Sequence, residues 1–300
     1  MDIETPSENS GASENTDTGA SENDDTGNPS GASESSDTGT SEDTKNSSAA
    51  SSVNSGRKIF FLYPTPSTVN QVITELIQNE YEAYSAKDHT RLARSLKKYS
   101  DSIIFVNIDE KMPVTEWEKW ISSVYTIAPD TKLGIFSSKN DEEFRDKFVK
   151  AHNISCGFQM LKNDMSKITE VILEMMNVMN VKGRRKYLRA SAERDGNATI
   201  NIPSGGDFIN GIVKDISVVG ISCVFEQDPV LSKNSLLKDV QIKLQSVLLN
   251  VETILFGSRE DGGEKTYVML FTQRVGSEVR IKIRKYIQQS LQRKIDAEIN

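Results

Sequence analysis

Residues 59–66 read Ile59-Phe-Phe-Leu-Tyr-Pro-Thr-Pro66. A short apolar run closed by prolines is typical of a strand buried on both faces. The pattern returns in Ile103-Ile-Phe-Val106 and in Leu133–Phe136. Strands buried on both faces belong to parallel sheets, because helices cover the two sides of such sheets. The stretch therefore predicts an α/β domain built around a parallel sheet.

Helical periodicity fills the intervals between these runs and completes the domain. Two further strand-like segments are short, at Glu82–Ala86 and Phe158–Leu161. The expected helices cover Val69–Ile77, a segment carrying Leu92, Leu96 and Tyr99, Thr115–Ile127, Glu142–His152 and Ile168–Met179. Five β/α units over residues 57–181 predict a flavodoxin-like (βα)5 fold. Trp117 and Trp120 lie three apart on one predicted helix, and we expect them to face a core or a domain interface.

The segment Asp109-Glu-Lys-Met-Pro113 resembles the one around the phosphorylated Asp of two-component receivers. Ser137 and Lys162 stand where that family has a Ser/Thr and a Lys. The resemblance also implies an acidic, magnesium-holding pair after the first strand, but Tyr63-Pro-Thr65 contains no acid. If Asn107 ends the third strand, Asp109 lies in the loop beyond it. We therefore expect a pseudo-receiver used for contacts, with phosphorylation at Asp109 as the alternative.

After Gly183 the pattern changes to short β-like runs separated by glycine-rich turns. The turn signals are Pro203-Ser-Gly-Gly-Asp207 and Glu260-Asp-Gly-Gly-Glu264. Six such runs predict a six-stranded antiparallel β-barrel, and Ser277 can cap a final helix. The expected strands are Thr199–Ile202, Phe208–Val213, Ile221–Phe225, Val240–Leu244, Leu248–Phe256 and Thr266–Phe271, and the expected helix face is Val279, Ile283, Ile287 and Leu291.

Two short motifs lie in the first part of this second half. The first is Lys182-Gly-Arg-Arg-Lys-Tyr-Leu-Arg189, and the second is Asp215-Ile-Ser-Val-Val-Gly220 at the end of a strand. An Arg-x-x-x-Arg alone is weak, since Arg280-Ile-Lys-Ile-Arg284 also fits and is expected to be one face of the final helix. The pair, in this order and spacing, resembles the PilZ family of cyclic di-GMP receptors. The resemblance covers about residues 183–295.

The arginines suit a cyclic dinucleotide on chemical grounds. The planar guanidinium pairs with phosphate oxygens or with guanine O6 and N7, and it stacks on bases. Arg185 and Arg189, four apart in a linker, could close over one ligand together. The resemblance also implies that Arg184, an additional Arg before Arg185, accompanies binding of a stacked ligand dimer.

The second motif offers complementary groups. Asp215 supplies an acceptor and Ser217 a hydroxyl for the amino edge of guanine, and the resemblance implies that they hold guanine from the barrel. Gly220 permits either a close backbone approach or a positive φ. Without the family pattern, a basic solvated linker and an ordinary β-turn would explain the same residues.

The charge of the chain is unevenly distributed. The whole chain has a net charge of −7. Residues 1–56 hold twelve acidic residues and one basic residue, so this segment has a net charge of −11, and the remaining 244 residues have a net charge of +4. The segment repeats with a period of eight, as in Gly11–Thr18 and Gly19–Thr26, and has no apolar face. We expect it to be disordered. It is either an acidic arm with a function or an expanded repeat without one.

Composition excludes several classes of function. No apolar run is long enough to cross a bilayer, and the N-terminus lacks the features of a secretory signal. Two separated cysteines and two histidines predict no metal site, no disulfide framework and no Ser-His-Asp triad. Residues 183–300 carry only +4 and lack an aromatic-basic stripe, so nucleic acid is not an expected partner.

We expect three regions: a disordered tail over 1–56, a receiver-like domain over 57–181 and a PilZ-like barrel over 182–300. The expected function is that of a cytoplasmic, non-enzymatic cyclic di-GMP effector. Binding of the ligand would order the linker 182–189, rearrange the domains and alter contact with an unidentified protein, in motility or surface behaviour as the family implies. The alternatives are a response regulator phosphorylated at Asp109 and a PilZ-like interaction module without nucleotide binding.

Overall fold

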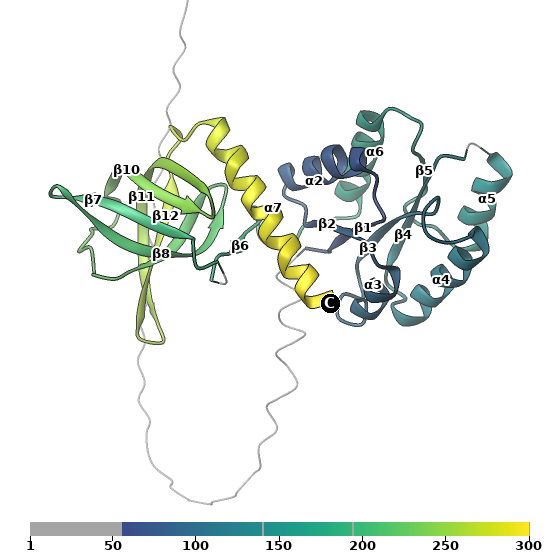
Figure 1. Ribbon diagram of the computed structural model, residues 1–300, viewed down its shortest axis with the longest axis horizontal. Coiled ribbons are helices and arrows are strands. Elements are labelled where there is room, and N and C mark those ends of the chain that lie inside the picture. Colours follow the sequence, from purple (N-terminus) through teal and green to yellow (C-terminus); the bar gives the residue numbers. More distant parts are fainter. Residues whose placement is uncertain (1–55, 140, 194, 300) are drawn as a thin grey trace, which may run out of the picture. The chain divides into compact units, whose positions relative to one another are not determined.

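The computed structural model describes residues 56–299 apart from residues 140 and 194 (Figure 1). The predicted disorder of 1–56 thus lies outside the described residues, except at Gly56. Five parallel strands form the first sheet in the order β2-β1-β3-β4-β5. Their bounds are β1 Ile59–Leu62, β2 Ala83–Ala86, β3 Ile103–Asn107, β4 Lys132–Ser137 and β5 Phe158–Met160.

Helices cover both faces of this sheet. Successive side chains of a strand point to opposite sides, so strands that are apolar throughout have an apolar face on each side, and helices bury both. Phe60 and Leu62 enter a core shared with one set of helices, whereas Ile59 and Phe61 enter a second core with the other set. The first set is α3 His89–Ser95, α4 Val114–Ile127 and α5 Glu142–Ala151; the second is the π-helical turn η1 Thr68–Ile73, α2 Thr74–Gln78 and α6 Met165–Val178. The predicted flavodoxin-like fold is confirmed, and Trp117 and Trp120 are buried in the first core.

One expected helix is shorter than its pattern. The helix predicted to carry Leu92, Leu96 and Tyr99 ends at Ser95. The Ser95 hydroxyl donates to the Leu92 carbonyl (2.7 Å), a local bond that competes with continuation of the helix. Tyr99 consequently lies in the following turns, where its ring packs against Phe60 with centroids 6.3 Å apart.

The second half is a closed antiparallel barrel. Six strands run in the order β8-β7-β10-β11-β12-β9, and pairing of β9 with β8 closes the sheet. Their bounds are β7 Thr199–Ser204, β8 Asp207–Ser217, β9 Gly220–Phe225, β10 Leu236–Leu244, β11 Val247–Asp261 and β12 Glu264–Phe271. The predicted six-stranded barrel is confirmed. A two-residue strand that the pattern did not predict, β6 Ala190–Ser191, pairs with β8.

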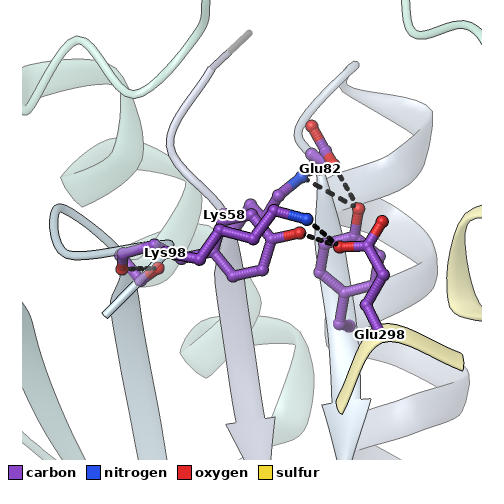
Figure 2. Close-up of polar contacts among 7 residues, drawn as sticks. Lys58, Glu82, Lys98 and Glu298 are labelled. Carbon is purple, nitrogen blue, oxygen red and sulfur yellow. Dashed lines mark hydrogen bonds and ion pairs between the residues drawn. The ribbon is translucent and has the colours of Figure 1, made fainter. Parts of the chain in front are cut away.

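The final helix, α7 Ser277–Ile299, contributes side chains to two cores. Ile283 and Ile287 belong to the barrel core, whereas Ile295 belongs to the first core of the α/β domain. Near its end, Lys98 donates to Glu298 (2.7 Å) beside the Lys58–Glu82 ion pair (Figure 2). Within the described residues, α7 and the other helices are too short or too polar to cross a membrane.

Candidate ligand-binding site

The two halves of the Arg/Asp-Ser-Gly pattern meet on the outside of the barrel. The first half occupies the linker between α6 and β6, directly before Ala190. Ser191 pairs with Asp215 and Ala190 with Ile216, so β6 lays the end of the linker along β8. This register brings Arg189 Nη1 to 3.6 Å from Asp215 Oδ1. Arg189 and Asp215 are 26 positions apart in sequence, and the pairing of the two-residue strand β6 with β8 brings them together as an ion pair.

Asp215 is held in place from the barrel side. It follows a register shift in the pairing of β8 with β9 and lies opposite Ser222. The buried Ser222 hydroxyl donates to Asp215 Oδ2. The side chains of Arg189 and Asp215 are 51% and 32% exposed, so a ligand can reach both. At such exposure their mutual attraction is weak, and an incoming anion can replace it.

Ser217 and Gly220 shape the turn between β8 and β9. The Ser217 hydroxyl donates to the Gly220 carbonyl (3.1 Å) and is buried, so in this structure it stabilises the turn. A Cβ on Gly220 would lie 2.3 Å from the Met269 carbonyl oxygen. Of the two roles considered for Gly220, the structure therefore shows the close backbone approach. Direct contact of Ser217 with a ligand stays a prediction.

The other two arginines lie further back in the linker. Arg184 and Arg185 are both exposed. Arg185 lines a hollow of about 80 Å³ together with Arg189, Glu80 and Tyr81. The linker is fixed there because the Leu188 backbone N–H donates to Glu80 Oε2 (2.8 Å). Glu80 belongs to the α/β domain, and its contact with the linker carried no sequence signal.

Arg280 is a second residue that sequence reasoning missed. Its guanidinium donates to the carbonyls of Val218 (2.5 Å), Val275 (3.2 Å) and Thr272 (3.3 Å). Val218 lies in the turn between Ser217 and Gly220, so Arg280 ties this turn to the start of α7. The sequence interpretation placed Arg280 on a helix face, which is correct, but the pattern did not indicate the partner of its side chain.

The α/β domain has a different arrangement at the expected phosphoacceptor. Asn107 ends β3, so Asp109 lies in the loop beyond the strand. Asp109 accepts hydrogen bonds from the Ser137 hydroxyl (2.6 Å) and the Ser138 backbone N–H (2.5 Å). Ser137 is thus beside Asp109 as predicted. Among the described residues, no ion pair or hydrogen bond joins Lys162 to it.

The residues around Asp109 do not fit a magnesium ion. The positions after β1 hold Tyr63 and Pro64, and the Tyr63 hydroxyl is 2.8 Å from Nδ1 of His89. The Asn107 amide donates to the Tyr63 carbonyl (3.0 Å). Among the side chains that the structure describes, no three acidic, His or Cys residues are grouped to hold a metal.

We expect Asp109→Asn to leave acetyl-phosphate labelling unchanged, at background in both the parent and the variant. Phosphoryl transfer to a carboxylate needs a cation to neutralise developing charge, and this pocket has tyrosine and proline where the acids should be. Mass spectrometry after incubation with acetyl phosphate and magnesium measures the labelling. Magnesium-dependent phosphorylation of the parent that disappears in the variant would instead favour a response regulator.

Comparison with known proteins yields similarity to solved structures only. No family model matches the sequence, and no curated protein matches it either. The chain is similar to the PilZ domain of YcgR from Escherichia coli, solved with c-di-GMP, at 18% identity, covering 38% of this chain and 96% of that one with a TM-score of 0.33. It also covers 50% of a longer YcgR structure, at 17% identity and a TM-score of 0.33 over 39% of this chain.

The chain is also similar to a second group of solved structures, which includes a signal receiver domain from Pseudomonas fluorescens at 11% identity, with a TM-score of 0.35 over 42% of this chain and 98% of that chain. A response regulator from Thermotoga maritima is 17% identical, with a TM-score of 0.35 over 41% of this chain and 98% of that chain. The chain spans about half the length of the longer YcgR structure.

Proposed function

We propose that this protein is a cyclic di-GMP receptor that binds its ligand between the linker 182–189 and the turn after β8. The observation that carries the proposal is the 3.6 Å approach of Arg189 to Asp215, which unites both motifs on an exposed surface. The YcgR domain named above is solved with the same ligand, but the proposal rests on the residues of this chain.

The chemistry of the site matches a dianionic purine ligand. Arg185 and Arg189 supply planar cationic donors for phosphates and for the guanine O6/N7 edge. The Asp215 carboxylate can accept from the N–H groups of guanine, while Ser217 holds the turn that carries it. Arg184 would take part if two stacked ligands bind. A calorimetric stoichiometry of one ligand per protomer would remove that role.

The output we propose is a change in domain arrangement. The linker contacts the barrel through Arg189 and the α/β domain through Leu188, and α7 packs on both cores. A ligand that draws the arginines onto the barrel changes the two linker contacts, that of Arg189 with Asp215 and that of Leu188 with Glu80. The α/β domain then acts as a non-enzymatic contact module for a cytoplasmic protein partner, with motility control as the proposed setting.

The test is a calorimetric titration of the full chain with cyclic di-GMP. Arg185→Ala and Asp215→Ala are each expected to weaken binding by about 30-fold, close to 2 kcal/mol, because each removes a charge-assisted hydrogen bond. Arg259→Ala is the matched control: this arginine is exposed on the barrel and pairs with Thr266, away from the turn.

Parent affinity in both site variants would show that the assigned residues are wrong. A parent that binds no cyclic di-GMP would favour the alternative of an interaction module without nucleotide binding. A loss in Arg259→Ala as large as in the site variants would point to general electrostatic attraction rather than to a site.

A further inference from the structure

Glu80 occupies a backbone position that usually belongs to glycine. Its N–H donates to the Ile77 carbonyl (3.1 Å) and the Tyr81 N–H donates to the Leu76 carbonyl (2.9 Å), the hydrogen bonds of a Schellman helix end. Glu80 has a φ of +64°, in the left-handed region that disfavours residues with a Cβ. Termination of α2 alone therefore does not account for a glutamate here, and its side chain is the feature to explain.

The Glu80 carboxylate joins three parts of the molecule. One oxygen accepts from the backbone N–H of Leu188 in the linker at 2.8 Å. The other lies 3.5 Å from Arg284 Nη2 on α7. The Glu80 side chain is only 12% exposed. The α/β domain thus holds the linker and the helix that follows the barrel through a single carboxylate.

The Glu80 contact leaves both motif arginines at one small hollow. Arg189 lies beside Asp215, and it also lines the hollow of about 80 Å³ that Arg185 forms with Glu80 and Tyr81. Leu188 lies between them in sequence and is fixed to Glu80. Small-molecule sites usually enclose about 300–1,000 Å³, so the hollow is too small for a cyclic dinucleotide. For both guanidinium groups to hold one ligand at Asp215, the backbone at Leu188 has to move away from the α/β domain.

We propose that Glu80 is a latch: it holds the ligand-binding linker on the α/β domain, and cyclic di-GMP binding breaks its hydrogen bond with Leu188. The inference rests on the proposed function and names its regulation. Because coupling of two equilibria is reciprocal, a latch that opposes binding is opened by the ligand. Arg284 contacts the other carboxylate oxygen, so a Glu80 side chain that moves into solvent on opening also leaves Arg284, and the change at the linker reaches α7.

The electrostatics of the latch make it easy to open. Burial raises the pKa of Glu80, and the Leu188 N–H and the Arg284 charge offset this only in part. The ionised carboxylate is therefore less stable at this place than in water. Moving Glu80 into solvent recovers that difference, which lowers the cost of releasing the linker.

The decisive measurement compares cyclic di-GMP affinity in full-length variants. Glu80→Ala removes the acceptor and should tighten binding about tenfold, within the usual range for coupled sites. Glu80→Gln keeps an acceptor for Leu188 but is uncharged, so an intermediate gain of about threefold is expected. Glu75→Ala, on the helix that precedes Glu80 and with its side chain bonded only to Asn79 among the described residues, is the charge-matched control and should bind like the parent.

A measurement without ligand separates the latch from the proposed function. Leu188 amide exchange with solvent, followed in protein with ¹⁵N-labelled leucine, should be at least about tenfold faster in Glu80→Ala than in the parent. Faster exchange with unchanged or weaker affinity would overturn the latch and leave the proposed function intact. Equal exchange rates would overturn the contact itself. Failure of the parent to bind cyclic di-GMP would end both proposals.

Discussion

Replacing Trp117 with alanine is expected to lower the free energy of unfolding of the α/β domain by about 3–5 kcal/mol. Trp117 is completely buried, and its indole N–H donates to the Glu110 carbonyl (3.1 Å). Its ring meets those of Tyr63, His89 and Trp120 with centroids 6.0, 6.0 and 5.6 Å apart. Alanine would leave a large cavity at the centre of this aromatic cluster and would remove one of the two hydrogen bonds that the Glu110 carbonyl accepts, the other coming from the Met112 N–H (2.8 Å).

The chain offers a domain-specific probe for this measurement. Trp117 and Trp120 are the two tryptophans of the sequence, so fluorescence of Trp120 during urea unfolding reports on the α/β domain alone in the variant. Trp117→Phe keeps most of the ring volume and should lose less than half as much stability. Lys119→Ala, exposed on the same helix, should stay within about 0.5 kcal/mol of the parent. A loss below about 1 kcal/mol for Trp117→Ala would contradict the packing described.

The aromatic cluster also explains the pseudo-receiver character in physical terms. Tyr63 stands where the receiver resemblance implies an acid, and its hydroxyl is hydrogen-bonded to His89. Tyr63 thus contributes packing and a hydrogen bond to the stability of the domain, at a position where phosphoryl transfer would need an acidic residue. The absence of acids was readable in the sequence, but the residues that fill their place come from the residue after β1 and from α3 and α4, and could not be paired by pattern.

Most of the fold was predictable because its signals are local. Continuous apolar runs such as Ile59–Leu62 are strong signals of buried strands, and the bounds of these runs agree with the structure to within one residue. β6 was not predictable, because Ala190-Ser191 has no strand pattern and becomes a strand only by pairing with β8. The last turns of α7 continue one helical period, yet Ile295 packs on a different core from Ile283. Periodicity defines a buried face but does not identify what covers it.

The candidate site shows the same limit. The motif residues Arg189 and Asp215 are adjacent in the structure, and their binding of a ligand stays a prediction. The groups that position them are distant in sequence: Glu80 bonds to a residue 108 positions away, and Arg280 to one 62 positions away. Ser217 shows a further limit, because a hydroxyl suited to a ligand is equally suited to bond within its own turn. Only the fold decides between these uses.

Gly220→Ala is expected to destabilise the barrel by up to about 3 kcal/mol and to abolish tight cyclic di-GMP binding. The new Cβ would lie 2.3 Å from the Met269 carbonyl oxygen and 3.1 Å from Leu270 Cα. Both are backbone atoms of β12, and Gly220 pairs with Leu270, so relief requires β9 and β12 to separate. Separation displaces the turn that presents Asp215.

Two buried thiols distinguish a barrel defect from a global one. Cys223 lies in the barrel core and Cys156 in the α/β domain. Burial raises the pKa of both, that of Cys156 to about 11, so each reacts with iodoacetamide only when its own domain opens. In urea, Gly220→Ala should lower the midpoint for labelling of Cys223 and leave that of Cys156 in place. Gly276→Ala, with no atom within 4 Å of its new Cβ, is the control. Equal midpoints for Cys223 in the two variants would show that β9 and β12 do not need the glycine.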